Sequence, residues 1–427
     1  MKKIVLLFIL IGASLALAQN SAFVINGSAE TLSRINLETG QVQNHIVTLG
    51  AVPNQVICHS EMLYVVNSTS ASLMVIDPSD YSIDMEILLP LNSNPWNVAV
   101  SGGFAYVTGL ATSSVYAVDL TAGSVIDTYE VGLSPEGIVS QGDRLYVTNT
   151  GFNPIDFSYG QGSVSILETS SGTELARVNV SKNPQAVEVG PDGLINVICT
   201  GNYSSVFGMI YFIDPWEMMA VDSLATGGFP VKFAINSAGI GFISAGGWVN
   251  DGHVYSYDTL DRVLLRGDDN PILVGTGSYG IAIDSLDYIY SVGQIANSVS
   301  KFNSEGEIID TYNVGSGPVS IAILDTRTSI DEIAEIPYKC SLNTPYPNPF
   351  NSSVVIPYES KTGNTITIEI FDIGGRLVKR LSSRSDHSIY NSVIWNGLDM
   401  RCQEVVTGIY FARLAGTNET EKMVLLR

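Results

Sequence analysis

Alternation of apolar and polar residues dominates the chain and predicts β-strands throughout. Three segments combine aliphatic with aromatic residues and end in a small or amide residue: Leu63–Asn67, Ala105–Gly109 and Leu145–Asn149. Each is followed, after a loop, by a second alternating segment that ends in an acid: Ser72–Asp77, Ser114–Asp119 and Ser163–Glu168. No stretch of a dozen residues carries apolar positions at helical spacing, so the pattern indicates an all-β protein.

The same pair of strands recurs along most of the chain. The aromatic position of its first strand holds Phe23, Tyr64, Tyr106, Tyr146, Asn196, Phe242 and Tyr290. Successive positions are 41, 42, 40, 50, 46 and 48 residues apart, and Asn196 is the degenerate member. A strand that commonly ends in glycine and one that often opens with proline complete each unit. Four short strands in about 40 to 50 residues are the signature of a β-propeller blade, and seven units predict seven blades.

The order of strands within the repeat predicts how the ring closes. The chain enters near Ala22 at the second strand of a blade, and a lone first strand, Pro318–Leu324, ends the repeat region. We expect this last strand to complete the first blade, because that pairing leaves no open sheet edge where the ring meets itself. The predicted propeller spans residues 19–324.

With the repeats aligned, their second strands resemble the YVTN family of propeller repeats, whose consensus is Tyr-Val-Thr-Asn. Tyr146–Asn149 matches that consensus at every position, whereas Tyr64–Asn67 and Tyr106–Gly109 differ at one position each. A later repeat departs most, with Cys199 where the consensus has Asn. The resemblance implies the propeller fold and leaves the function open, because such propellers include surface-layer proteins, binding proteins and a lactonase-like branch.

A second, shorter module follows residues 325–341, which we interpret as a linker. Its alternating segments predict strands at Val354–Tyr358, Thr365–Phe371, Leu377–Leu381, Val393–Trp395, Ile409–Leu414 and Met423–Leu426. Strands of this length in residues 342–427 predict a small Ig-like β-sandwich.

Five blocks of this module resemble the type A sorting domain of the type IX secretion system. The first is the entry motif Tyr346-Pro347-Asn348-Pro349-Phe350-Asn351. The others are residues 371–378, residues 395–397, residues 407–414 with Gly408 and Tyr410, and residues 422–427 from Lys422 to Arg427. The family usually ends in Lys rather than Arg, and it usually has a Gly-containing turn at residues 401–403. The resemblance implies a Gram-negative bacterium whose type IX machinery reads this module, with its later cleavage left open.

Residues 1–18 have the features of a secretory signal peptide. Lys2 and Lys3 precede an apolar run from Ile4 to Ile11, and Ala16–Ala18 forms a small-x-small cleavage site. The run is shorter than the about 20 residues of a membrane-spanning helix, and no later segment is apolar for long enough to span a bilayer. We therefore expect a mature protein that begins near Gln19 and reaches the outer cell surface or the medium by way of the periplasm.

The charge of the chain is strongly negative and lies in its larger part. The formal net charge is −21, and residues 338–427 hold 10 Lys and Arg against 8 Asp and Glu, which leaves −23 for residues 1–337. Binding to nucleic acid needs a cationic surface, so the composition argues against a nucleic-acid partner. Solubility outside the cell is the simpler reason for the negative charge.

The four cysteines show no zinc-binding spacing. Cys58 and Cys199 lie in apolar strand segments, which predicts free buried thiols. Cys340 and Cys402 lie toward the C-terminus, where an exported protein could oxidise them to a disulfide, and the sequence does not decide whether they pair.

One face of the predicted propeller carries the candidate binding residues. Loops between the second and third strands share that face with the loops that enter the first strands, and residues 150–159, 201–207 and 246–251 form three consecutive loops that combine aromatic with amide or acid groups. Such groups suit a sugar ring or a peptide. The predicted ligand-binding residues are Trp96, Phe152, Asp156, Tyr159, Tyr203, Trp248, Asp251 and Tyr279. Alternatively, these aromatics only cap the blades.

Three functions are compatible with this sequence. The first is a non-enzymatic surface or secreted protein that binds a glycan, peptide or protein partner. The second is a lactonase-like hydrolase or lyase, which would need His253 and at least two acids in one pocket. The third is a structural surface-layer unit.

No residue is assigned as catalytic or as a metal ligand, and no cofactor is required. Asp251, Asp258, Asp268 and Asp269 could gather calcium, although no loop has EF-hand spacing. The acids that end the third strands recur in most blades, which favours a role in turns rather than in one unique site.

Overall fold

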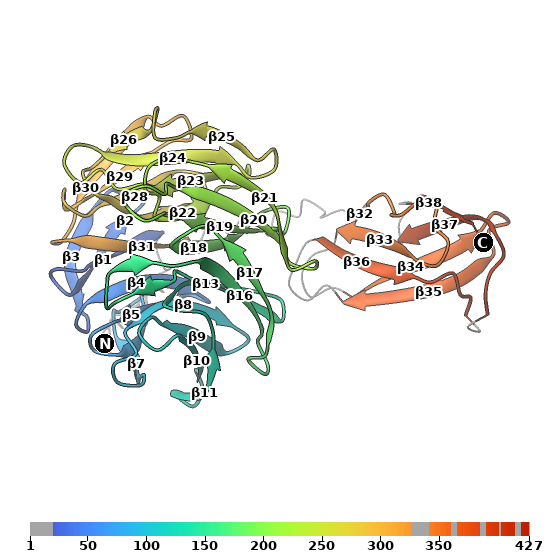
Figure 1. Cartoon of the computed structure of the whole chain (residues 1–427), viewed down its shortest axis with the longest axis horizontal. Coiled ribbons are helices and arrows are strands. Elements are labelled where there is room, and N and C mark those ends of the chain that lie inside the picture. The colour runs from blue at the N-terminus through green and yellow to red at the C-terminus, as the bar shows by residue number, and fades with distance from the viewer. Residues whose placement is uncertain are drawn as a thin grey trace, which may run out of the picture. The chain divides into compact units, whose positions relative to one another are not determined.

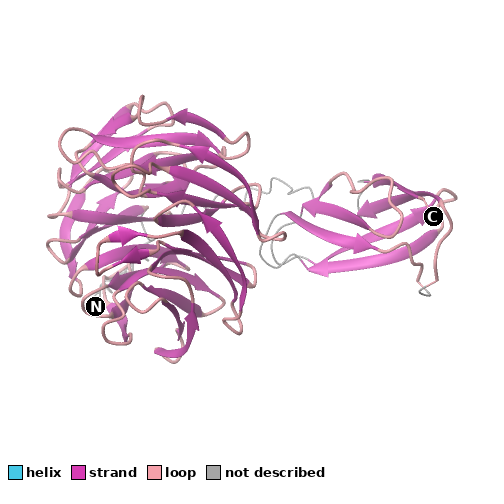
Figure 2. Cartoon of the chain, viewed as in Figure 1, coloured by secondary structure: helices cyan, strands magenta, loops and turns pink. Residues whose placement is uncertain are grey.

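The computed structural model describes residues 20–325, 341–359, 365–384, 390–400, 403–414 and 420–426, which fall into two compact units. Both units consist of strands and turns, and the described residues include no helix (Figure 2). None of these residues therefore forms a helix with the length and apolar character needed to cross a membrane. The predicted signal peptide and residues 326–340 of the predicted linker lie outside the described residues.

Seven antiparallel sheets of four or five strands make up most of the first unit, and each of these sheets is one blade (Figure 1). Blade 1 contains β31 (Pro318–Leu324), β1 (Ser21–Asn26), β2 (Thr31–Asn36) and β3 (Val42–Thr48). Blade 2 contains β4 (Pro53–His59), β5 (Met62–Asn67), β6 (Ser72–Ile76) and β7 (Ile83–Leu88). Blade 3 contains β8 (Pro95–Ser101), β9 (Phe104–Gly109), β10 (Ser114–Asp119) and β11 (Ser124–Glu130).

The remaining four blades follow in chain order. Blade 4 contains β12 (Pro135–Gln141), β13 (Arg144–Asn149), β16 (Gly162–Glu168) and β17 (Glu174–Val180), with the hairpin β14 (Phe152–Asn153) and β15 (Ser158–Tyr159) between β13 and β16. Blade 5 contains β18 (Pro184–Val189), β19 (Ile195–Cys199), β20 (Met209–Asp214) and β21 (Met219–Ala225). Blade 6 contains β22 (Lys232–Ile235), β23 (Ile240–Ser244), β24 (Gly252–Asp258) and β25 (Val263–Arg266), and β26 (Ile272–Val274) also pairs with β24. Blade 7 contains β27 (Ser278–Ile283), β28 (Ile289–Gly293), β29 (Ser298–Phe302) and β30 (Ile308–Asn313).

The two ends of the repeat region close the ring. Strand β31 pairs antiparallel with β1, with Val24 opposite Ile321 and Ser21 opposite Leu324. In Figure 1 the orange β31 accordingly lies beside the blue β1. The fold is the predicted seven-bladed β-propeller, and the predicted closure by Pro318–Leu324 is confirmed.

Apolar side chains fill the spaces between neighbouring blades. Seven separate core clusters occur in this unit, each shared by two adjacent blades, and the last joins Val24 and Ile35 of blade 1 to Tyr290 and Tyr312 of blade 7. Second strands are covered on both faces, so every residue of β1 is buried. This explains why the second strands read as nearly continuous apolar runs rather than as strict alternation.

The degenerate repeat has a structural explanation. Asn196 is buried at the aromatic position of β19, where it accepts a hydrogen bond of 3.0 Å from the hydroxyl of Tyr257 in blade 6. Its own amide donates to the carbonyl of Leu194 at 3.1 Å. Tyr257 of the next blade therefore supplies the aromatic ring that this repeat lacks. The Asn196 amide in turn provides the hydrogen-bond partner that the buried Tyr257 hydroxyl needs.

The acids at the ends of third strands form turns, as predicted from their repetition. The Asp119 carboxylate accepts backbone N–H groups of Thr121 and Ala122 at 2.8 and 2.9 Å. Asp258 holds the N–H groups two and three residues further on in the same way. These carboxylates are Asx-turn acceptors.

Glycine and asparagine of the repeat meet between blades. A Cβ atom added at Gly132, after the outer strand of blade 3, would lie 2.5 Å from the side chain of Asn149 in blade 4. Gly50 approaches Asn67 in the same way at 2.7 Å. The Asn149 amide is in turn fixed by donating to the hydroxyls of Ser163 and Ser165 at 3.2 and 2.9 Å. The glycine that ends the outer strand is therefore required by the asparagine that ends the next Tyr-Val-Thr-Asn strand.

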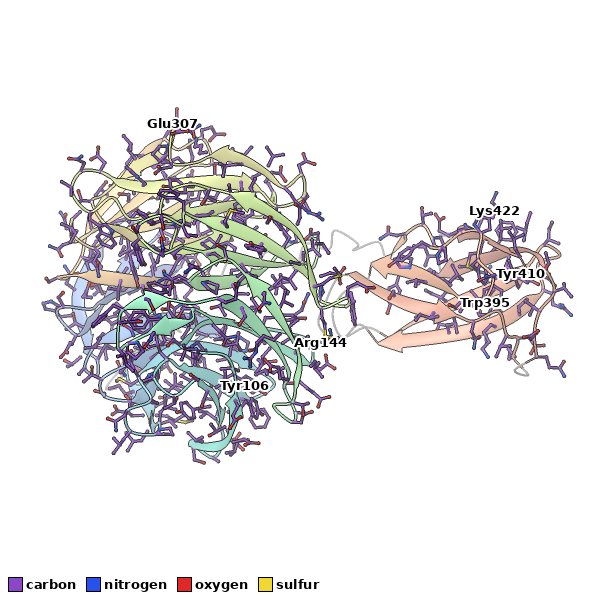
Figure 3. All side chains as sticks on the ribbon, in the orientation of Figure 1. Tyr106, Arg144, Glu307, Trp395, Tyr410 and Lys422 are labelled. Carbon is purple, nitrogen blue, oxygen red and sulfur yellow. The ribbon has the colours of Figure 1, made fainter. Side chains whose placement is uncertain are left out.

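The second unit is a two-sheet sandwich. One sheet contains β32 (Ser341–Leu342), β33 (Val354–Glu359) and β36 (Tyr390–Trp395), and the other contains β35 (Leu377–Arg384), β34 (Thr365–Asp372), β37 (Gly408–Leu414) and β38 (Thr420–Leu425). The Trp395 and Tyr410 rings, labelled in Figure 3, pack at 5.0 Å between centroids in its core. The predicted sandwich is confirmed.

Two cysteines lie in the described part of the propeller and both are free thiols. Cys199 is buried and Cys58 is only partly buried, so the prediction of burial holds fully for Cys199 alone. Burial raises the pKa of the Cys58 thiol to about 11, which makes it a poor nucleophile at neutral pH. Cys340 and Cys402 lie outside the described residues.

We expect Gly132→Ala to destabilise the propeller, because its Cβ atom would have to displace Asn149 or the strand that carries it. A forced contact of this kind costs about 1–3 kcal/mol. The melting temperature should fall by several degrees. Gly160→Ala is the control, because a Cβ atom there meets a backbone oxygen only at 3.4 Å. Equal melting temperatures for the two variants would show that the glycine–asparagine contact is not tight.

Candidate functional site

The first strands of all seven blades surround the axis of the propeller. A cavity of about 330 Å³ at the axis is bounded by residues of every one of them, from Gln55–Cys58 on β4 to Ser320–Ile323 on β31. A second cavity of about 260 Å³ lies where these strands begin. Lys232, the first residue of β22, lines both cavities and therefore stands between them.

Lys232 connects opposite sides of the ring. Its ammonium group donates a hydrogen bond to Oε1 of Gln55, which belongs to blade 2, whereas Lys232 belongs to blade 6. The same oxygen accepts a hydrogen bond from the hydroxyl of Ser320 in blade 1 at 3.4 Å. The bond between Lys232 and Gln55 crosses the axis and separates the two cavities.

Glu136, the second residue of β12, is buried close to this bond and is 7% exposed. Burial raises the pKa of its carboxyl group to about 8, against the opposing effect of the Lys232 charge. Burial also lowers the pKa of Lys232 to about 8, and here the Glu136 charge opposes the change. Removal from water disfavours the charged form of each group, so both change protonation near neutral pH.

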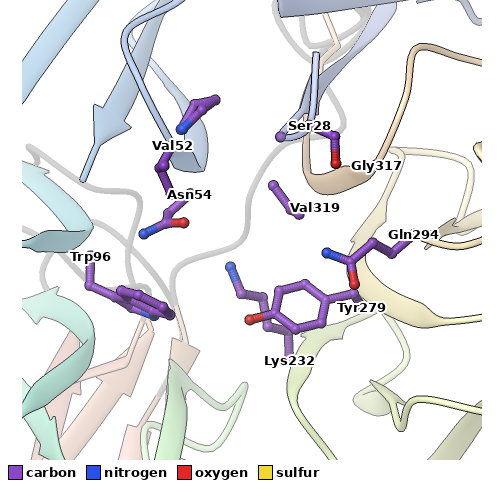
Figure 4. A pocket seen from close by; sticks show the side chains of 11 residues that line it. Ser28, Val52, Asn54, Trp96, Lys232, Tyr279, Gln294, Gly317 and Val319 are labelled. Atoms are coloured by element: carbon purple, nitrogen blue, oxygen red, sulfur yellow. The ribbon is translucent and has the colours of Figure 1, made fainter. Parts of the chain in front are cut away.

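The smaller cavity combines hydrogen-bond donors with aromatic rings. Figure 4 shows the Lys232 ammonium and the side-chain amides of Asn54 and Gln294 directed toward the space between Trp96 and Tyr279. The Lys232 nitrogen lies 5.8 Å from the centroid of the Tyr279 ring. The two predicted axial aromatics, Trp96 and Tyr279, are therefore brought together at one cavity.

A row of aromatic rings occupies the same face beside the axis. Tyr159 lies 6.0 Å from Tyr203, and Tyr203 lies 5.4 Å from Phe229, measured between ring centroids. Phe152 extends the row beyond Tyr159 at 5.2 Å, and Phe207 extends it beyond Phe229 at 5.8 Å. The contacts of Tyr203 with Tyr159 and of Phe229 with Tyr203 and Phe207 join separate loops, whereas Phe152 and Tyr159 belong to one hairpin.

Trp248 adds a ring in the loop between β23 and β24 of blade 6. It is 49% exposed and lies 6.4 Å from Tyr279 between ring centroids. Its loop turns at Gly247, whose φ is 82° and where a Cβ atom would lie 2.2 Å from the carbonyl oxygen of Asp251. Only glycine fits that position.

The loop that carries Tyr203 is held by its own hydrogen bonds. The Asn202 side-chain oxygen accepts the N–H groups of Ser204, Ser205 and Val206 at 3.2, 2.9 and 2.8 Å. Tyr203 has a φ of 56°, in the left-handed region that bulky residues rarely adopt. Its side chain nevertheless remains 50% exposed. A fixed loop thus presents an exposed ring through an unfavourable backbone conformation.

Three tyrosine hydroxyls lie within electrostatic range of Glu136. Burial raises the pKa of Tyr159, Tyr203 and Tyr279, and the Glu136 charge raises each of them further. All three stay protonated at neutral pH, and they can therefore donate hydrogen bonds to a ligand.

The two predicted carboxylates are not part of this cluster. Asp156 accepts hydrogen bonds from the N–H and hydroxyl of Ser158 at 3.0 and 2.6 Å, which lower its pKa and form the turn between β14 and β15. Asp251 is exposed in the loop before β24. Neither residue lines the two axial cavities.

His253 also lies outside both axial cavities, and its backbone pairs with Ala245 and Gly246. Tyr255 donates a hydrogen bond of 2.8 Å to Asp268, which gives that acid a structural partner. In the part of the chain that the structure describes, no group of three or more His, Cys, Asp or Glu residues is placed to hold a metal ion. The hydrolase alternative and the calcium ligand remain predictions.

Sequence reasoning missed the polar residues at the axis, among them Asn54, Gln55, Glu136, Lys232 and Gln294. Four of them lie one or two residues after the proline that opens a first strand. Their positions could have identified them in the sequence, because first strands line the axis. A polar or charged residue at the start of such a strand points to a function. Gln294 lies in the loop after β28 and carries no such mark.

The entry motif of the second unit holds its last strand. Asn348 donates to the carbonyl of Lys422 at 2.7 Å and accepts the N–H of Val424 at 2.9 Å. Phe350 packs on Trp395 at 5.7 Å between centroids, and Tyr410 donates to the carbonyl of Val406 at 2.7 Å. Lys422, labelled in Figure 3, is exposed, and Arg427 lies outside the described residues. The first and last blocks of the motif therefore form one structural unit.

Residues 344–426 match the family described as the secretion system C-terminal sorting domain. The second unit is therefore a C-terminal sorting domain, which supports secretion through the type IX system. A search of curated proteins gives no significant match.

Solved structures show the fold of the larger unit. A putative 6-phosphogluconolactonase from Bacteroides uniformis has a TM-score of 0.57 at 14% identity, over 72% of this chain and 100% of that one. A protein of unknown function from Desulfotomaculum acetoxidans has a TM-score of 0.57 at 14% identity, over 71% and 99%. Hydrazine synthase from Kuenenia stuttgartiensis has a TM-score of 0.53 at 19% identity, over 63% and 89%. These likenesses concern the fold alone.

We expect Glu136→Gln to stabilise the protein at pH 8.5 and to have little effect near pH 5. The folded-state pKa of Glu136 is raised from 4.5 to about 8, so the native state holds a proton that the unfolded state has lost between these values. The free energy of unfolding therefore falls as pH rises through this window, by up to about 1.4 kcal/mol per pH unit. Glutamine removes that loss.

Melting temperatures measured from pH 5 to pH 8.5 test this prediction. The variant should melt at least about 4 °C above the parent at pH 8.5. Glu130→Gln, on the exposed outer strand β11, is the control and should follow the parent at every pH. A constant difference between parent and Glu136→Gln across the range would contradict the assigned burial of the carboxyl group.

Proposed function

We propose that this protein is a secreted or cell-surface binding protein whose ligand is a glycan. The observation that carries the proposal is the row of aromatic rings from Phe152 to Phe207, together with the pair formed by Trp248 and Tyr279, of which Tyr279 lines the smaller axial cavity. Sugar rings stack on aromatic faces, and their hydroxyl groups require directional hydrogen bonds beside those faces.

The exposure of the rings supports a ligand-binding role. Tyr203, Phe207 and Trp248 are each about half exposed, at 50, 52 and 49%. Phe157 and Val249 in the same loops are exposed at 75 and 90%. Concentrated apolar exposure on one face of a soluble unit is a common mark of an interaction site.

The polar groups beside the rings favour a glycan over an extended peptide. Gln185 bonds to the Tyr203 hydroxyl at 3.4 Å, and the Lys182 ammonium donates to the carbonyl of Tyr159 at 2.7 Å. Among the described loops of this face, the hairpin of β14 and β15 has strands of two residues each, so it offers an added peptide strand only a very short edge. The predicted residues Asp156 and Asp251 would contribute at the outer rim of the same face.

Export follows from the sorting domain. In the proposed route the predicted signal peptide takes the chain to the periplasm, and the type IX machinery then reads the C-terminal unit. The propeller would be delivered to the medium or retained on the outer surface, where glycans are abundant ligands.

Binding to an array of glycans and peptides is the first test. Trp248→Ala and Tyr203→Ala should each lower affinity by about tenfold or more, because a lost stacking ring costs about 1–3 kcal/mol. Melting temperatures should change little, since both side chains are half exposed. Trp216→Ala is the matched control, because Trp216 is 79% exposed in the turn between β20 and β21 and lies in none of these loops.

Two results would count against the glycan proposal. One is that neither glycans nor any other ligand class on the array binds the folded protein. The other is that Trp248→Ala and Tyr203→Ala melt several degrees lower and bind as the parent does, which would make the rings structural caps. A peptide hit lost in these variants would keep the face and reassign the ligand.

Removal of residues 344–427 tests the export route. In a host with a type IX system, the truncated chain should stay in the periplasm, because the segment that the translocon reads is missing. Immunoblots of periplasm, outer membrane and medium measure this. The Trp248→Ala variant should be exported normally, and export of the truncated chain at parental levels would refute the assigned role of the sorting domain.

A further inference from the structure

Lys232 is the sole Lys or Arg among the described residues that line the two axial cavities. Around it the smaller cavity is otherwise uncharged, with Asn54, Gln294 and Ser28 as polar groups and Trp96 and Tyr279 as rings. A buried ammonium costs free energy unless it gains a strong partner. The amide oxygen of Gln55 is a neutral acceptor and provides only part of that compensation.

The acids of the propeller lie mainly away from this cation. Third strands begin at the face with the cavity and end at the opposite face, and it is at that opposite end that Asp77, Asp119, Asp214 and Asp258 form their turns. A strand of six residues spans about 20 Å, which exceeds the Debye length of about 8 Å at physiological salt. The negative net charge therefore does not exclude an anionic group from the axial cavity.

A carboxylate fits this cavity better than a multiply charged group. A single ammonium can neutralise one carboxylate, and no second Lys or Arg among the described residues lines the smaller cavity to neutralise a further negative charge. The volume of about 260 Å³ is below the usual lower limit of about 300 Å³ for pockets that hold drug-sized molecules, so it suits one ring. Trp96 and Tyr279 supply apolar walls for that ring, and Asn54 and Gln294 supply amide donors.

We propose that Lys232 binds the carboxylate of an acidic sugar, so that the glycan taken up by this face carries a uronic acid seated in the axial cavity. The carboxylate replaces Gln55 as the partner of the ammonium group, because a charge-assisted hydrogen bond is stronger than one to an amide. The flanking aromatic row then holds neighbouring sugar units. This inference rests on the proposed glycan-binding function and specifies its ligand.

Glucuronate- and galacturonate-containing oligosaccharides are the probes, each paired with its carboxyl-reduced, neutral counterpart. Affinities are measured by titration calorimetry on the chain from Gln19 to Arg427 with a calcium chelator present. The unmodified protein should bind an acidic oligosaccharide at least about tenfold more tightly than its neutral counterpart. Lys232→Met should remove that preference, so that the acidic oligosaccharide and its neutral counterpart bind with similar affinity.

Lys301→Met is the matched control, because Lys301 also lies over tyrosine rings, 4.1 Å from the Tyr288 centroid, and lies outside the cavities. The Lys301→Met variant also loses one positive charge, and it should keep the full preference for the acidic over the neutral oligosaccharide. Lys232→Arg retains a cation and should keep part of the preference for the acidic oligosaccharide. This variant allows the role of the cation to be tested even if Lys232→Met folds poorly. Melting temperatures of all variants identify any loss of folding.

The outcomes separate this inference from the function on which it rests. Equal binding of acidic and neutral oligosaccharides by the unmodified protein would overturn the role of Lys232 while leaving glycan binding intact. A preference that survives in a folded Lys232→Met variant would overturn it as well. Failure of every oligosaccharide to bind would instead refute the glycan-binding proposal itself.

Discussion

The pairing of β31 with β1 is the constraint on which the rest of the larger unit depends. It joins residues almost 300 positions apart in the chain and replaces a covalent link by antiparallel backbone hydrogen bonds over the whole of β1. Without it, blade 1 would lack its first strand and the axis would lack one of its seven walls. The same pairing places Ser320 beside Gln55, and so it also helps to position the partner of Lys232.

Neighbouring blades are held together by two kinds of contact that recur around the ring. Apolar side chains of the second and third strands fill the space between sheets, and buried hydroxyl groups add directional bonds. Thr108 of blade 3 donates to the carbonyl of Glu136 in blade 4 at 2.9 Å, and Thr200 of blade 5 donates to the carbonyl of Pro230, which precedes β22, at 2.7 Å. Both bonds act on the segments that begin first strands, so the packing between blades also fixes the groups that face the axis.

The polar groups buried at the axis lower the stability of the propeller. Glu136 and Lys232 are buried, and burial shifts the pKa of each toward neutrality, so each charged form costs free energy in the folded state. An apolar pair would avoid that cost, and the seven core clusters between the blades show that the chain can supply apolar packing. Retention of an acid and a base at this position is consistent with selection for a function at the axis.

The sequence by itself determined the all-β fold, the seven repeats, the closing strand and the sorting module. These features depend on the local alternation of apolar and polar residues and on the spacing of repeats and motifs along the chain. It also predicted one face with aromatic loops, where Tyr159 contacts Tyr203 and Trp248 contacts Tyr279, which lines the same cavity as Trp96. Only the tertiary structure decided that Glu136, Lys232 and Gln55 meet at the axis, since they come from three blades and no local pattern relates them. The tertiary structure also decided that Asp156 lies outside the aromatic cluster, because its carboxylate accepts hydrogen bonds from Ser158 in its own turn.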